Sequence, residues 1–151
     1  MRIKAKIVQG YGVASGKSGD VRFPMGTIQM QLKYFLERGL DLSNYYRGTL
    51  NVDIAPSHFK MVKPKFFIEN MKWSKDMPPE NFYFFDVMVS VEEEEMYEGL
   101  IYMPDPKTKV EHEQKPTVLE LMLPKIEDLH YGQTLYVQVK EEQIAIVRQS
   151  L

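Results

Sequence analysis

Apolar and polar residues alternate at the start of the chain. Three basic residues between positions 2 and 8 are interleaved with the apolar side chains of Ile3, Ala5 and Ile7. A period of two places one side of a β-strand on a core and the other side in water. The pattern therefore predicts a strand over Arg2–Val8 with its basic side chains exposed.

A second segment has the spacing of a helix. Apolar residues recur three or four positions apart at Met25, Ile28, Leu32, Phe35 and Leu36. This spacing predicts an amphipathic helix over Met25–Arg38 that ends at Gly39, because glycine is the commonest residue just past a helix. The side that faces away from the apolar stripe is expected to carry Gln29, Gln31, Lys33 and Glu37.

The remaining apolar segments are short, rich in β-branched and aromatic residues, and separated by proline and glycine, which is typical of strands. They predict strands at Met61–Ile68, Phe82–Val91, Met96–Met103, Thr117–Leu123, Thr134–Val139 and Gln143–Val147. Six aromatic side chains are expected to be core residues, with stacking on a flat ligand as the alternative: Phe66, Phe67, Trp73, Tyr83, Phe84 and Phe85. Many short strands with one early helix predict a mainly β fold, a small barrel with one flanking helix.

The composition limits the kinds of protein this could be. A chain of 151 residues with 44% hydrophobic and 26% charged residues predicts one globular domain over residues 1–151. There is no cysteine, which excludes disulfides and thiolate metal sites and fits a cytoplasmic protein. No segment reaches the ~18 to 20 apolar residues of a membrane span, and no secretory signal is recognisable. We therefore expect neither a membrane span nor a targeting segment.

The charge balance argues against nucleic-acid binding. Nineteen basic and 21 acidic residues give a net charge of -2, so the broad positive field that attracts nucleic acid is missing. A local basic face stays open as an alternative, formed by Arg2, Lys4 and Lys6 together with Lys60, Lys63 and Lys65.

A glycine-rich segment follows the first strand. Residues 10–20 contain four glycines, which let main-chain N–H groups approach a ligand closely. The P-loop spacing is not met, because Gly10 leaves five residues and Gly12 leaves three before Gly16. The dinucleotide-binding spacing also fails, since Ser15 stands where the third glycine belongs. The segment is predicted either to cradle phosphates with main-chain N–H groups or to be a flexible hairpin loop.

Two neutral polar side chains stand two residues apart on a predicted strand. Apolar and polar residues alternate over Arg47–Ile54, with Thr49, Asn51 and Asp53 on the polar side. Thr49 and Asn51 thus present their oxygens to one side of the strand, as a Mg²⁺ ion already bound to phosphate oxygens would require. The alternative is an ordinary hydrogen-bonded polar face.

Glu120 is a candidate carboxylate. In the segment Thr117–Leu123 it shares one side of the strand with Val118, while the opposite side carries three leucines. A carboxylate there is either an ordinary outward residue or an acceptor for hydroxyl or N–H donors of a ligand. The chain has no Gly-x-Ser-x-Gly nucleophile elbow. Metal-ligand spacing is also missing among the histidines, which are expected to be surface or structural residues: His58, His112 and His130.

Five segments, taken in order, resemble the archaeal CTP-dependent riboflavin kinase family. They are Gly10–Gly12, the helix Met25–Arg38, Tyr46–Val52, Glu98–Pro104 and Thr117–Pro124. The most specific piece is Gly48-Thr49-Leu50-Asn51 after a helix, and the resemblance spans nearly the whole chain, weakening after Pro124. It implies a six-stranded cradle-loop barrel that transfers the γ-phosphoryl group of CTP to the 5′-hydroxyl of riboflavin, giving FMN.

The resemblance also implies roles for individual residues. Thr49 and Asn51 would hold Mg²⁺, and Glu120 would contact the flavin, with Thr108 as a further flavin contact. Lys125 would belong to the nucleotide site, whose phosphates would be wrapped by Gly10, Tyr11, Gly12, Val13, Ala14 and Ser15. This division suits phosphoryl transfer, which needs positioning and charge stabilisation more than covalent chemistry by the protein.

Three segments depart from the family pattern. The family's glycine loop commonly continues Gly-x-Gly-Glu-Gly, where Val13-Ala14-Ser15-Gly16 stands here. Its basic Lys-Leu-Arg-type segment after the proline is replaced by Lys125-Ile126-Glu127-Asp128, and Asp105-Pro106-Lys107 alters the flavin-side loop. These departures leave an alternative open, a non-catalytic barrel that binds a nucleotide, a flavin or a protein partner.

Overall fold

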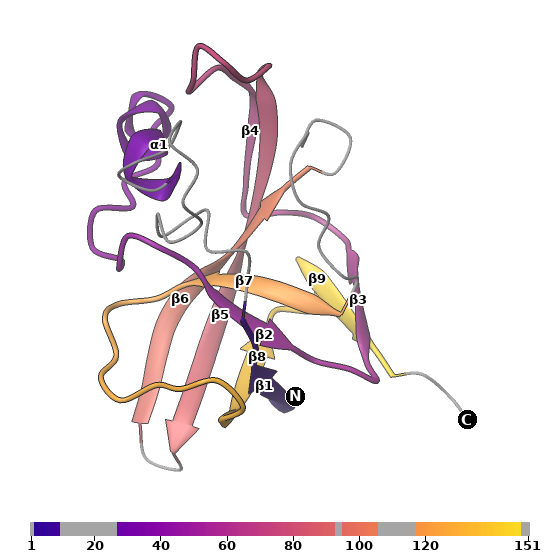
Figure 1. Ribbon diagram of the computed structural model, residues 1–151. Coiled ribbons are helices and arrows are strands. Elements are labelled where there is room, and N and C mark those ends of the chain that lie inside the picture. The colour runs from indigo at the N-terminus through magenta and orange to yellow at the C-terminus, as the bar shows by residue number, and fades with distance from the viewer. Residues whose placement is uncertain (1, 10–26, 93–94, 106–116, 149–151) are drawn as a thin grey trace.

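The computed structural model describes residues 2–9, 27–92, 95–105 and 117–148 of the chain (Figure 1). Its elements in chain order are β1 (Arg2–Ile7), α1 (Thr27–Glu37), β2 (Leu50–Asp53), β3 (His58–Met61), β4 (Phe66–Met71), β5 (Glu80–Glu92), β6 (Glu95–Pro104), β7 (Val118–Met122), β8 (Thr134–Val139) and β9 (Ile144–Val147). The chain is mainly β with one helix among these residues, as the apolar pattern predicts.

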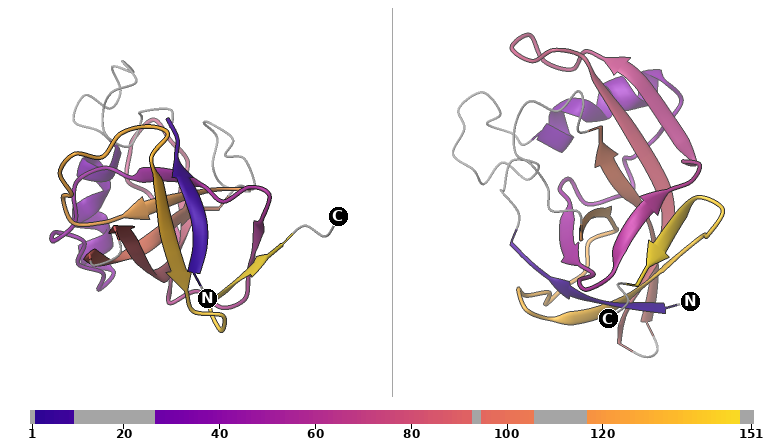
Figure 2. Two further views of the ribbon diagram at one scale, coloured as in Figure 1. Left: turned by 90° about the horizontal axis from the view of Figure 1, so that it is seen from below. Right: turned by 90° about the vertical axis from the view of Figure 1, so that its right-hand side faces the viewer.

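Six strands close into an antiparallel barrel. Hydrogen bonding joins them in the order β5-β6-β7-β2-β1-β8, and β8 pairs with β5 over Val87–Ser90 to complete the circle (Figures 1 and 2). Closure removes the unpaired strand edges that an open sheet would leave. The predicted six-stranded barrel with a flanking helix is therefore confirmed.

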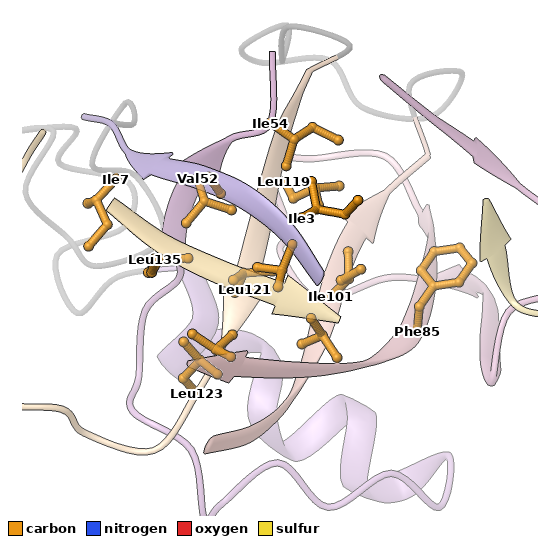
Figure 3. Close-up of a cluster of buried hydrophobic side chains, with 14 of the residues drawn as sticks. Ile3, Ile7, Val52, Ile54, Phe85, Ile101, Leu119, Leu121, Leu123 and Leu135 are labelled. Atoms are coloured by element: carbon orange, nitrogen blue, oxygen red, sulfur yellow. The ribbon is translucent and has the colours of Figure 1, made fainter. Parts of the chain in front are cut away.

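The larger apolar cluster fills the barrel interior (Figure 3). Side chains alternate along each strand, so Ile3, Ala5 and Ile7 of β1 are buried while the basic residues between them are exposed. β7 follows the same rule, with Leu119 and Leu121 in the interior cluster. The residue between these two leucines, Glu120, consequently lies on the outside of the barrel wall.

A second apolar cluster lies between α1 and the outside of the barrel wall. Phe35 of α1 contacts Phe82 and Phe84 of β5 edge to face, with ring centroids 5.1 and 5.3 Å apart. Tyr102 of β6 and Met122 of β7 belong to the same cluster. This part of the wall is therefore covered by the barrel core on one face and by the helix on the other (Figure 1).

The two faces of α1 differ from the prediction at two positions. Gln31 is 2% exposed, whereas Leu36 is 58% exposed. Gln31 stands three residues after Ile28 and four before Phe35, so it shares a helical face with these two buried residues. The prediction that Gln31 lies on the exposed polar side of the helix is therefore wrong. The prediction that Leu36 belongs to the buried apolar stripe is also wrong.

The predicted end of the helix is confirmed at Gly39. This glycine has a φ of 89°, a backbone conformation that side chains with a Cβ rarely adopt. Its N–H donates to the carbonyl of Leu36, and the N–H of Leu40 donates to the carbonyl of Phe35. These bonds satisfy carbonyls that the last helical turn leaves without a helical partner. The predicted first residue, Met25, lies outside the described residues.

The predicted strand Met61–Ile68 is wrong, because two strands occupy this part of the chain. β3 ends at Met61 and pairs with β9, whereas β4 starts after the break and pairs with β5. Between them the N–H groups of residues 62 and 63 both donate to the carbonyl of Gln143 at 2.9 Å. Pro64 has no N–H to contribute to a strand ladder, so the apolar run is interrupted there.

Candidate functional site

The two loops that the resemblance assigns to the substrates lie outside the described residues. They are the glycine-rich segment Gly10–Ser15 and the flavin-side loop with Thr108. The chain that leads to the first loop is described, and the N–H of Val8 donates to the carbonyl of Asn51 at 2.9 Å. The end of β1 therefore lies directly beside Asn51.

Three candidate residues from two distant segments meet on the outer wall of the barrel. β2 and β7 are antiparallel neighbours, and their register places Asn51 opposite Glu120. Thr49 stands one residue before β2, and its hydroxyl donates to Oε1 of Glu120 at 3.2 Å. All three side chains are partly buried. We call Thr49, Asn51 and Glu120 the Thr49–Glu120 corner.

The corner brings together oxygen donors of two kinds. The hydroxyl of Thr49 and the amide of Asn51 are neutral, and Glu120 adds one carboxylate. Mg²⁺ prefers oxygen ligands and commonly keeps water or phosphate oxygens in its remaining positions, so this donor set fits it. In the described part of the chain no three His, Cys, Asp or Glu side chains gather where they could hold a metal. A zinc-type site is therefore not formed by these residues.

A buried hydrogen bond lies beside the corner. Tyr102 of β6 is paired in register with Glu120, and its hydroxyl donates to Oε1 of Gln31 on α1 at 2.9 Å. Burial, followed by the nearby carboxylates of Glu120 and Glu80, raises the pKa of Tyr102 well above its ordinary value. The phenol therefore stays protonated and keeps donating. Through this bond α1 is tied to the strand next to the corner.

We expect Tyr102→Phe to lower the free energy of unfolding by about 1 to 3 kcal/mol, because the amide of Gln31 loses its partner inside an apolar cluster. Denaturant titration followed by circular dichroism measures the change. The double variant Gln31→Leu/Tyr102→Phe removes both polar groups and should be more stable than the sum of the two single losses predicts. Strictly additive losses would show that the two side chains do not interact.

Lys125 lies in an exposed ion pair. Its ammonium is 3.7 Å from a carboxylate oxygen of Glu127, and the two side chains are 70% and 77% exposed. Pairs that are this exposed contribute little to stability. The contact does not connect Lys125 with the Thr49–Glu120 corner, so its role at a nucleotide stays a prediction.

The predicted aromatic core is confirmed for Trp73, Phe84 and Phe85, which are buried. It is wrong for Phe67, which is 44% exposed and stacks on Tyr83 with 4.9 Å between ring centroids. Phe67 belongs to β4, which pairs with β5 outside the closed barrel and is not enclosed by the barrel's other strands. Phe66 and Tyr83 are half-buried against the two apolar clusters, and stacking of a flat ligand stays an alternative for these exposed and half-buried rings.

The basic face considered for nucleic acid is partly neutralised. Lys65 and Lys140 place their ammonium groups 2.8 and 3.3 Å from the carboxylate of Asp86. Burial raises the pKa of Asp86, but hydrogen bonds from Lys65, Gln143 and Lys140 outweigh it and hold that pKa below its ordinary value. Asp86 is therefore ionised at neutral pH and offsets the charge of Lys65.

Sequence patterns miss the residues that hold the corner against the helix. The spacing of α1 contains a usable signal for Gln31, since a polar residue three after Ile28 and four before Phe35 lies in the apolar stripe. Tyr102 has no comparable signal, because its neighbours Glu120 and Gln31 are each 18 or more positions away in the chain. Only strand register and helix packing bring them together.

No protein-family model matches the sequence, and no curated protein matches it either. The resemblance to the riboflavin kinase family therefore stays a prediction from the motifs of this chain. Within the described ranges, no helix combines the length and the apolar character that crossing a membrane would need.

Proposed function

We propose that this protein is a Mg²⁺-dependent kinase that transfers the γ-phosphoryl group of a nucleoside triphosphate, CTP by resemblance, to the 5′-hydroxyl of riboflavin. The bond between the γ-phosphorus and the bridging oxygen breaks, and a bond from that phosphorus to the riboflavin oxygen forms. The hydroxyl proton is released, and the products are FMN and a nucleoside diphosphate. A chain without cysteine suits the reducing cytoplasm as the place of this reaction.

The observation that carries the proposal is the contact between Thr49 and Glu120. The resemblance assigns Thr49 to the metal and Glu120 to the flavin, although 71 positions separate them in the sequence. Transfer requires the donor phosphate and the acceptor hydroxyl to approach within about 3 to 3.5 Å. The side chains that the resemblance assigns to the metal and to the flavin lie 3.2 Å apart, so the two substrates would be held next to each other.

The residues of the corner would divide the work. Thr49 and Asn51 would hold Mg²⁺ through their hydroxyl and amide oxygens, neutral ligands that suit an ion whose charge the phosphates balance. When bound, the ion would neutralise charge on the transferring phosphoryl group. Glu120 would accept hydrogen bonds from hydroxyl or N–H groups of the flavin and so orient the acceptor. Tyr102 would keep β6 and α1 in place beside it.

The test is formation of FMN by the purified chain. Riboflavin is incubated with Mg²⁺ and with CTP, UTP, ATP or GTP in turn, and FMN is separated from riboflavin by chromatography. We expect FMN with CTP and Mg²⁺, and none when EDTA is present. Absence of FMN with all four nucleotides would refute the proposal.

Glu120→Gln is expected to weaken riboflavin binding more than nucleotide binding, because it removes a charged acceptor while preserving size. Quenching of riboflavin fluorescence measures flavin affinity, and calorimetry measures CTP affinity. A charged hydrogen bond is worth enough to predict a loss of about ten-fold for riboflavin and less than about two-fold for CTP. Equal losses for the two ligands would contradict the flavin contact.

A second candidate function is a non-catalytic barrel that binds a nucleotide, a flavin or a protein partner. The exposed pair of Lys125 and Glu127 favours it, because an acidic residue there offsets the charge that the family's basic segment would bring to a nucleotide. The same assay separates the candidates. Fluorescence quenching of riboflavin without FMN would support the binding protein, and FMN would exclude it.

A further inference from the structure

Arg47 is a cation two residues before Thr49, and it has no acidic partner among the described residues. Its guanidinium Nη1 donates to Oε1 of Gln29 on α1 at 3.0 Å. The residue is exposed, and it forms no ion pair with any described residue. A guanidinium stays charged in proteins, so Arg47 offers its remaining N–H donors and a full positive charge at this surface.

The backbone on both sides of Arg47 is held against the barrel. The N–H of Tyr46 donates to the carbonyl of Leu123 at 2.8 Å, just past the end of β7, and the N–H of Gly48 donates back to Tyr46 at 2.9 Å. Thr49 follows at once and contacts Glu120. The backbone of Arg47 is thus held two residues before Thr49 by the end of β7, and its side chain is held by Gln29 of α1.

The corner lacks the positive charge that its proposed ligand needs. Thr49 and Asn51 are neutral and Glu120 is acidic, whereas a nucleoside triphosphate carries several negative charges. Phosphoryl transfer depends on neutralising that charge with cations as well as a metal. The cation that the resemblance supplies, Lys125, is paired with Glu127. Arg47 has no such competitor among the described residues.

We propose that Arg47 binds the polyphosphate of the nucleoside triphosphate at the Thr49–Glu120 corner, with Gln29 as its positioning residue. The inference rests on the proposed function for the identity of this ligand. The planar guanidinium can donate two parallel hydrogen bonds to phosphate oxygens, which a lysine ammonium cannot match in geometry. The bond to Gln29 limits the freedom of a long side chain and so reduces the ordering that binding requires.

The substitution Arg47→Met removes the charge and keeps an unbranched side chain. We expect it to raise KM for CTP about ten-fold, the size of one lost charged hydrogen-bond contact, with KM for riboflavin changed by less than about two-fold. CTP binding to this variant should also weaken less as salt is added, because one ionic contact is gone. Arg47→Lys should recover part of the affinity, and Gln29→Ala should lose less than Arg47→Met.

Lys33→Met is the matched control. Lys33 is an exposed cation of the same helix as Gln29, and its ammonium lies 5.0 Å from the ring centre of Tyr34. Removing its charge should leave KM for CTP unchanged. If Lys33→Met and Arg47→Met raise KM for CTP by the same factor, the rise is due to net charge and the proposal is overturned. Unchanged CTP affinity in Arg47→Met would also overturn it.

Calorimetry with inorganic triphosphate separates this inference from the proposed kinase activity. If triphosphate and CTP bind through Arg47 but no FMN forms, the kinase is refuted and the polyphosphate site stands. If FMN forms and CTP affinity is independent of Arg47, the kinase stands and the inference is refuted. A wild-type chain that binds neither CTP nor triphosphate refutes both.

Discussion

If the proposed kinase function holds, replacing Asn51 with alanine is expected to lower the rate of FMN formation by at least about 100-fold, because loss of a proposed Mg²⁺ ligand would remove several kcal/mol of transition-state stabilisation. The fold should survive, since Asn51 lies on the outer side of β2 and its neighbour Val52 supplies the buried side chain. The backbone carbonyl that accepts from Val8 also remains. The rate is measured over a range of Mg²⁺ concentrations, and raised Mg²⁺ should restore part of it.

Asn44→Ala provides the matched control for this variant. Asn44 is an exposed asparagine in the connection between α1 and β2, five residues before Thr49. Its substitution should leave both FMN formation and thermal unfolding unchanged. If Asn51→Ala forms FMN at a rate within about two-fold of the wild-type rate, the assignment of Asn51 to the metal is refuted. The description of the fold does not depend on this outcome.

Gly99→Ala is expected to destabilise the barrel by at least about 3 kcal/mol, at the upper end of what overpacking of a tight core costs. A Cβ at Gly99 would lie 2.3 Å from the carbonyl oxygen of Met122 and 2.6 Å from a methyl carbon of Leu123. The leucine side chain could turn away, but the backbone oxygen could move only if β6 and β7 separated. These strands are paired through Leu100 and Met122 in the closed barrel.

Thermal denaturation checks this expectation, with a fall in Tm of about 6 to 12 °C for a chain of this size. Gly39→Ala serves as the comparison, because nothing lies within 4 Å of a Cβ at Gly39 and its φ of 89° is the only source of strain. Left-handed backbone costs a non-glycine residue about 1 to 2 kcal/mol. If Gly99→Ala proves no less stable than Gly39→Ala, β6 and β7 do not approach as closely as described.

Local periodicity was sufficient to predict which side chains of the barrel wall face the core and which face outward. In β1 and β7 the alternation predicts which side chains enter the core, and Glu120 accordingly lies on the outer side of β7. The helix α1 ends at Glu37, one residue before the predicted Arg38, and Gly39 follows it with the positive φ that a glycine stop predicts. These features depend on the repeat of the backbone itself, two residues in a strand and 3.6 in a helix, so neighbours in the sequence carry the information.

Periodicity failed where a residue's surroundings come from distant elements. Met61–Ile68 begins and ends with apolar residues, yet it divides between two sheets because β3 pairs with β9 and β4 pairs with β5. Gln31 is polar yet buried, because Tyr102 satisfies its amide. Phe67 is aromatic yet exposed, because β4 lies outside the closed barrel. In each case the deciding contact is made by a segment far along the chain.

The sequence by itself determined that this chain builds a mainly β domain with one helix, and it marked Thr49, Asn51 and Glu120 as polar side chains on outward faces. The tertiary structure decided that these three meet, that Tyr102 and Gln31 join the wall to the helix beside them, and that Arg47 stands next to them without an acidic partner among the described residues. The physical reason is that strand pairing and barrel closure depend on register between distant segments. No local pattern of apolar and polar residues encodes that register.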